Sequence, residues 1–165
     1  MSRNPRSEQL QIRVSPAEKA AIRRAAEHAG LDMSAYVLSR AVPNAAMRLQ
    51  ECIEASAGPA PPSFALAELN TLLASWTAAE LREAIAAPPT TALAPFLSNY
   101  IAAMIEQACE RRSVRVPAWV RAVAPLPEPA FGSTLKSLRL HLLTHSPPPF
   151  RRRNIFIDAS VGDRV

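Results

Sequence analysis

Glycine is scarce in this chain, with only 4 in 165 residues, and no Gly-rich loop of the kind that holds phosphate groups is present. Cysteine is equally rare. Cys52 and Cys109 lie far apart and lack the short spacing of metal or redox motifs, so we expect two reduced thiols that serve in packing. No apolar run is long enough to cross a bilayer, and no signal peptide is recognisable. These absences predict a soluble, cytoplasmic protein without a membrane partner.

Residues suited to catalysis are also sparse. Acidic side chains are unpaired along the sequence, and no nucleophile has a recognisable base beside it. His141 and His145 would share one helix face, but no third ligand or nearby acid follows, so we expect no zinc site. The sequence therefore predicts a protein that is not an enzyme and that binds neither a metal nor another cofactor.

The charge of the chain is distributed unequally, although its total is only +5. Residues 1–56 carry a net charge of +2, residues 57–110 carry −4, and residues 111–165 carry +7. Hydrophobic residues make up 48% of the chain but aromatic residues only 5%, so the core should consist of Ala, Leu and Val. This length and these three zones favour one small domain followed by a second region.

Residues 9–14 alternate strictly between polar and apolar side chains, as a β-strand with one buried face does. The apolar face would hold Leu10, Ile12 and Val14, and the polar face Gln9, Gln11 and Arg13. A lone strand is not stable in water, so we expect it to pair antiparallel with the same strand of a second copy. The polar face of such a ribbon fits a DNA major groove, where Gln can bond adenine and Arg can bond guanine.

Two helices are predicted to follow this strand, over residues 15–29 and from residue 32 to about residue 42. Ser15 and Glu18 form a capping box at the start of the first helix, and Gly30 provides a left-handed stop after it. Apolar residues recur at helical spacing in both segments and would close over the shared strands. The expected dimer core consists of Leu10, Ile12, Val14, Ile22, Tyr36 and Val37.

The segment QLQIRV, followed by SPAEKAAIRRAAEHAG and LDMSAYVLSRAV, closely resembles the ribbon-helix-helix DNA-binding proteins of the MetJ and Arc type. Within that family it is most similar to antitoxins that neutralise acetyltransferase toxins. The resemblance covers residues 8–49 and implies an intertwined homodimer of one strand and two helices per chain. It also implies that Gln9, Gln11 and Arg13 contact the bases of a palindromic operator in double-stranded DNA.

The resemblance further implies how the DNA phosphates are held. In this family the N-terminus of the second helix grips a phosphate through free backbone amides, although Asp32 at the cap would compete with the phosphate here. Positive side chains near the start of the chain would add contacts by displacing counterions. The expected phosphate-contacting residues are Arg3, Arg6, Lys19, Met33 and Ser34.

Residues 57–63 are rich in proline and predict a linker, so the DNA-binding and dimerisation domain should span residues 1–56. Beyond it, helical patterns and a second capping box at Thr77 and Glu80 predict a small bundle. We expect residues 64–165 to form a helical partner-binding or oligomerisation region with an extended basic tail. The expected partner-binding residues are Trp119, Phe131, Ile155 and Phe156.

Two features of this region leave alternatives open. The basic run at residues 151–153 is suited to a solvated surface, to nucleic acid or to an acidic protein face. The strand-like run at residues 154–158 can add a strand to a partner protein or pair with residues 10–14 of the same chain. The second pairing would remove the reason for a dimer.

The sequence thus predicts a mainly α protein with an N-terminal ribbon-helix-helix domain and a C-terminal helical extension. The expected function is a DNA-binding repressor, an antitoxin that represses its own operon and binds a toxin through its C-terminal region. Related antitoxins usually end soon after the second helix, whereas more than a hundred residues come after it here. The alternatives are a repressor or plasmid-type DNA-binding protein that has no toxin and uses the extension to form a higher oligomer, and an interaction scaffold that binds no DNA.

Overall fold

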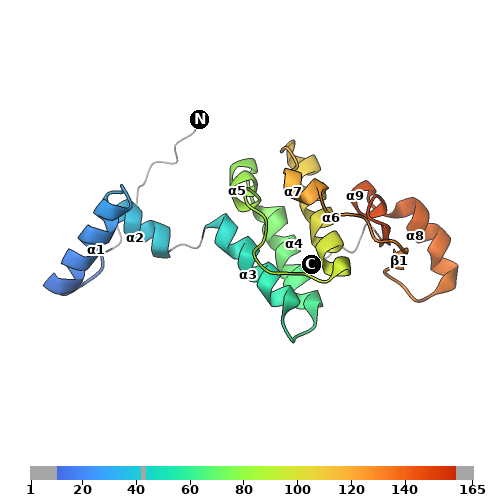
Figure 1. Cartoon of the computed structure of the whole chain (residues 1–165), viewed down its shortest axis with the longest axis horizontal. Coiled ribbons are helices and arrows are strands. Elements are labelled where there is room, and N and C mark those ends of the chain that lie inside the picture. Colours follow the sequence, from blue (N-terminus) through green and yellow to red (C-terminus); the bar gives the residue numbers. More distant parts are fainter. Residues whose placement is uncertain (1–10, 42–43, 159–165) are drawn as a thin grey trace. The chain divides into compact units, whose positions relative to one another are not determined.

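The computed structural model describes residues 11–41 and 44–158, and the described part is mainly helical (Figure 1). The chain divides into two compact units, Met1–Pro43 and Asn44–Val165, which we call unit 1 and unit 2. Each unit is described by itself below. In the described ranges, no helix combines the length and the apolar character that a bilayer crossing requires.

Unit 1 contains α1 (Pro16–His28) and α2 (Met33–Ala41), which pack against each other. The capping box that starts α1 is present: Glu18 N donates to Ser15 Oγ at 3.3 Å, and Ser15 N donates to Glu18 Oε2 at 2.7 Å. Gly30 follows α1 with φ of +67°, a conformation that costs glycine little because it has no Cβ. Both predicted helices are therefore confirmed.

The core of unit 1 is very small. Among the side chains of unit 1 whose burial is described, Ala26 is the one that is fully buried, and Ile22, Tyr36 and Val37 are half-buried. Five apolar side chains of this unit are exposed to solvent: Ile12, Val14, Leu31, Met33 and Leu38. A single copy of unit 1 therefore leaves most of its apolar surface uncovered.

Unit 2 begins with α3 (Ala45–Ala57) and α4 (Pro62–Ser75), which pack side by side, and α5 (Ala78–Ala84), which packs on α3. The division of the chain thus falls after residue 43 and not at residue 56. The physical reason is that α3 buries Leu49, Cys52 and Ile53 in the core of unit 2. The proline-rich residues at 58–61 form a short connection between two packed helices, with Pro62 in the first turn of α4.

The long helix α6 (Pro95–Arg112) lies at the centre of unit 2 and packs against α4, α7 (Ala118–Arg121) and α9 (Pro148–Arg151) (Figure 1). It buries eight side chains, including Ile101, Ala103 and Ile105. Helix α6 therefore supplies the largest share of the core among the helices of this unit.

The last part of unit 2 contains two short strands, β1 (Ala130–Phe131) and β2 (Ile155–Phe156). They pair in parallel, with Ala130 opposite Ile155 and Phe131 opposite Phe156. Between them lie the 3₁₀ helix η1 (Lys136–Leu138), α8 (Arg139–His145) and α9. Residues 155 and 156 thus pair within unit 2, and no pairing with residues 11–14 is present among the described residues.

Candidate nucleic-acid interface

The polar side chains predicted to contact bases lie on an exposed segment. Gln11 and Arg13 are exposed, whereas Gln9 and Leu10 lie outside the described residues. On the alternate positions, Ile12 is 58% exposed and Val14 is 42% exposed. The described part of the predicted strand, residues 11–14, has no regular structure and no strand partner among the described residues. The polar and apolar residues alternate as predicted, but the described residues of a single chain do not supply the pairing that a strand requires.

Helix α1 places an excess of positive charge on the surface next to this segment. Lys19, Arg23 and Arg24 are exposed and make no ion pair with a described residue. Glu18 is held by the backbone N–H and the hydroxyl of Ser15, and these hydrogen bonds keep the pKa of its carboxyl below the ordinary value. Exposed cations without acidic partners suit contacts with DNA phosphates. Arg3 and Arg6 lie outside the described residues.

The N-terminus of α2 is capped by an acidic residue. Asp32 Oδ1 accepts a hydrogen bond of 2.8 Å from the amide of Ala35. The amides of Met33 and Ser34, the first two in the helix, have no acceptor within the helix. Two free donors therefore remain for a phosphate, beside a carboxylate that repels it.

The four residues predicted to bind a partner protein make contacts with other residues of unit 2. Ile155 is 1% exposed, and the Nε1 of the half-buried Trp119 donates to the carbonyl of Ile85 at 3.0 Å. Phe131 and Phe156 stack on each other with ring centroids 5.2 Å apart. Ile155 is therefore covered by the fold itself, whereas Trp119, Phe131 and Phe156 remain half-buried, and their predicted role in partner binding stays a prediction.

The predicted basic tail is likewise part of the folded unit. Arg152 donates to Glu106 Oε1 at 2.8 Å and to Glu110 Oε1 at 2.6 Å. Arg153 is 5% exposed and donates to Glu106 and to the carbonyls of Val120 and Val123. Sequence reasoning missed these contacts, although Glu106 and Glu110 are four residues apart and must share one face of α6.

His141 contacts an acidic residue that the sequence analysis did not predict near it. His141 Nε2 lies 3.0 Å from Asp158 Oδ2, and the rings of His141 and His145 stack with centroids 4.0 Å apart. The described residues nevertheless contain no group of three or more donors arranged to hold a metal ion. Cys52 and Cys109 are buried, and burial raises the pKa of each thiol to about 11.

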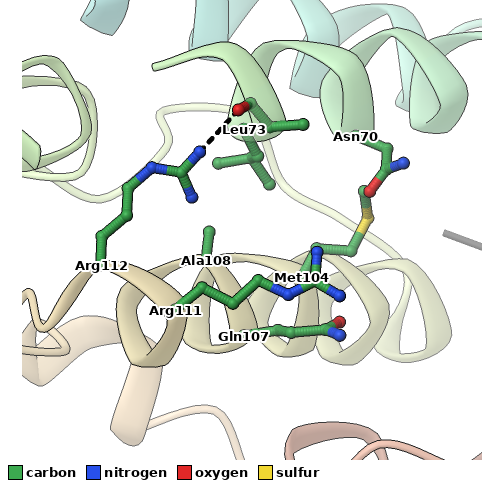
Figure 2. A pocket seen from close by; sticks show the side chains of 8 residues that line it. Asn70, Leu73, Met104, Gln107, Ala108, Arg111 and Arg112 are labelled. Carbon is green, nitrogen blue, oxygen red and sulfur yellow. Dashed lines mark hydrogen bonds between the residues drawn. The ribbon is translucent and has the colours of Figure 1, made fainter. Parts of the chain in front are cut away.

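A groove of about 370 Å³ lies between α4 and α6 (Figure 2). Its floor is formed by Leu73, Met104 and Ala108, and its rim carries polar side chains. Arg112 on this rim is already engaged, because its Nη2 donates to the carbonyl of Ala74 at 2.7 Å and its Nε donates to that of Trp76 at 2.6 Å. These bonds join the ends of α4 and α6.

The exposed alternating segment, the cations on α1 and the free amides of α2 all lie in the part of the chain for which a family comparison supports DNA binding of the ribbon-helix-helix type. Residues 4–45 match the model of the NikA-like family, described as mobilization protein NikA. The match ends within two residues of the boundary of unit 1 and leaves nearly all of unit 2 outside it. No curated protein and no solved structure matches the chain.

Proposed function

We propose that the chain is a homodimeric, sequence-specific DNA-binding protein whose paired N-terminal segments read a palindromic site through Gln9, Gln11 and Arg13. The family match over residues 4–45 supports this proposal. The observation that carries the dimer is the open apolar side of unit 1, where Ile12 and Val14 are exposed in a single chain. A second copy, paired across these segments, would give the backbone its ladder partners and cover the apolar side chains.

The chemistry of recognition arises from the polar face of such a ribbon. Glutamine presents an amide that can bond adenine bidentately, and arginine presents a fork that matches the N7 and O6 acceptors of guanine. Arg13 is exposed and makes no ion pair with a described residue, so its guanidinium is available for a base. Lys19 and the amides of Met33 and Ser34 would position the dimer on the phosphates without reading sequence.

We place this function in DNA mobilization first, because the matching family is described as a mobilization protein. This choice agrees with the alternative of a plasmid-type DNA-binding protein without a toxin. The antitoxin resemblance depends on residues 8–49 alone, and the chain beyond them is not a short toxin-binding tail. Residues 44–158 instead form a unit with a core of its own, which we assign to partner binding or oligomerisation.

The test begins with selection of bound sequences from a random duplex library by the full chain, followed by binding measurements at two salt concentrations. A palindromic consensus is expected. Arg13→Ala should cost about 1–3 kcal/mol on the selected duplex and remove the preference for it, whereas Lys19→Ala should weaken selected and random duplexes alike. Arg151→Ala, an exposed arginine of unit 2, is the matched control and should change neither. Binding without any sequence preference would contradict the proposal, and the absence of any DNA binding would favour the scaffold.

A further inference from the structure

Two cations lie in a row along one side of α1. A helix turns by about 100° per residue, and on α1 the apolar stripe that packs into unit 1 holds Ile22, Ala25 and Ala26. Lys19 and Arg23 lie four residues apart on one side of this stripe, and both side chains are exposed. We call Lys19 and Arg23 the basic row.

The acidic residues nearest to the basic row do not pair with it. The carboxylate of Glu18 accepts hydrogen bonds from the N–H of Ser15 at 2.7 Å and from its hydroxyl at 2.8 Å. Glu27 lies one turn beyond Arg23, and the structure has no ion pair between these two residues. Like charges four residues apart destabilise a helix slightly, and an anion beside them removes that repulsion. The basic row is therefore suited to an anionic partner.

A third exposed cation of α1, Arg24, points in another direction. It projects about 100° around the helix from Arg23, on the side nearly opposite the apolar stripe. In the proposed dimer the stripe faces the core, so the basic row borders that core while Arg24 lies on the outer surface. Arg23 and Arg24 therefore form a matched pair with the same charge on the same helix and on different sides of it.

The position of the basic row relates it to the segment that reads the bases. Helix α1 follows residues 11–14 directly through its N-cap Ser15, and Lys19 is in the first turn and a half of the helix. Lys19 and Arg23 are about 6 Å apart along the helix axis. One strand of DNA carries a phosphate about every 3.4 Å of its axis, so each cation can bind a phosphate of its own.

We propose that the basic row of each copy contacts two phosphates on the strand that flanks the bases read by Gln11 and Arg13, and that Arg24 contacts none. This inference rests on the proposed function. It adds Arg23 to the phosphate-binding residues and assigns the affinity that depends on salt to one side of α1. Contacts with phosphates carry no sequence information, so the row should set affinity without changing which duplex is preferred.

The test measures binding of the full chain to the selected duplex and to a random duplex over a range of salt concentrations. Each phosphate contact adds about 0.9 to the slope of log affinity against log salt, and each substitution occurs in both copies of the dimer. Arg23→Gln should therefore reduce the slope by about 1.8, so that a fourfold rise in salt weakens the parent chain roughly tenfold more than the variant. Lys19→Gln should have an equal effect, and the ratio of the affinities for the two duplexes should stay constant.

Arg24→Gln is the matched control and should leave the slope unchanged. Glutamine is a good helix former, and circular dichroism should show equal helix content in all variants. If Arg24→Gln reduces the slope as much as Arg23→Gln does, or if neither variant changes it, the basic row is wrong. A parent chain that still prefers the selected duplex in that case leaves the proposed function standing. A parent chain that binds neither duplex overturns both proposals.

Discussion

Units 1 and 2 differ in how much of their apolar surface one chain can bury. Residues 11–41 bury the side chain of Ala26, whereas unit 2 has a continuous core that runs from α3 to β2. Local structure does not explain this difference. The capping boxes Ser15–Glu18 and Thr77–Glu80 have the same geometry, with backbone-to-carboxylate bonds of 2.7 Å in both. Identical helix starts therefore serve one unit with a very small core and one unit with a continuous core.

The largest effect is expected when a core side chain of unit 2 is shortened. Ile105→Ala removes a fully buried side chain and should lower the free energy of unfolding of unit 2 by about 3 kcal/mol. Trp76 and Trp119 both lie in unit 2, so their fluorescence during urea titration reports this unit. Leu38→Ala, at an exposed position of unit 1, is the control and should leave the tryptophan transition in place. An equal shift in both variants would show that the units unfold together.

A second prediction concerns the arginines that the sequence placed on a basic tail. Arg153→Ala should cost unit 2 about 2–3 kcal/mol, because Glu106 loses a buried partner and the carbonyls of Val120 and Val123 lose their donor. The neighbouring Arg151→Ala should stay within about 0.5 kcal/mol of the parent chain, since Arg151 is exposed. Urea titration of the two variants measures the difference. Similar small effects would mean that the run is a solvated surface.

The matched capping boxes give the next smaller effect. Thr77→Ala should lower the stability of unit 2 by about 1 kcal/mol at every chain concentration. Ser15→Ala should leave the tryptophan transition unchanged and instead raise the concentration at which the dimer forms, because in the proposed dimer unit 1 would be stabilised by its partner copy. Sedimentation at several chain concentrations measures the second effect. A tryptophan transition that moves with chain concentration would break the distinction between the units.

The smallest effect is a dependence on pH at these caps. Backbone hydrogen bonds from Ser15 and Thr77, helped by their hydroxyls, hold the pKa values of Glu18 and Glu80 below the ordinary 4.5. A carboxyl with a lowered pKa in the folded state stabilises that state above pH 4.5, and the contribution is lost as the pH falls through the lowered pKa. Glu80→Gln should remove this acid-side loss from the urea midpoint of unit 2, and Glu83→Gln, outside the capping box, should retain it.

Features that depend on neighbours along the chain were predictable. The two helices of unit 1, the stop at Gly30 and both capping boxes arise from residues within one or two turns of each other. The alternation of Gln11, Ile12, Arg13 and Val14 marks the candidate DNA-reading face, and the match over residues 4–45 supports that class. The burial of Ile155 was not predictable, since it depends on pairing with Ala130 of β1, which lies 25 residues earlier.

By itself the sequence determined where the helices of unit 1 start and stop, because those ends arise from side chains that contact their own backbone. Only the tertiary structure decided that α3 belongs to unit 2, that Arg152 and Arg153 face Glu106, and that four leucines around α8 stay uncovered. Each of these features depends on contacts between segments that are distant in the sequence. Side-chain packing determines those contacts, and the periodicity of the sequence does not predict them.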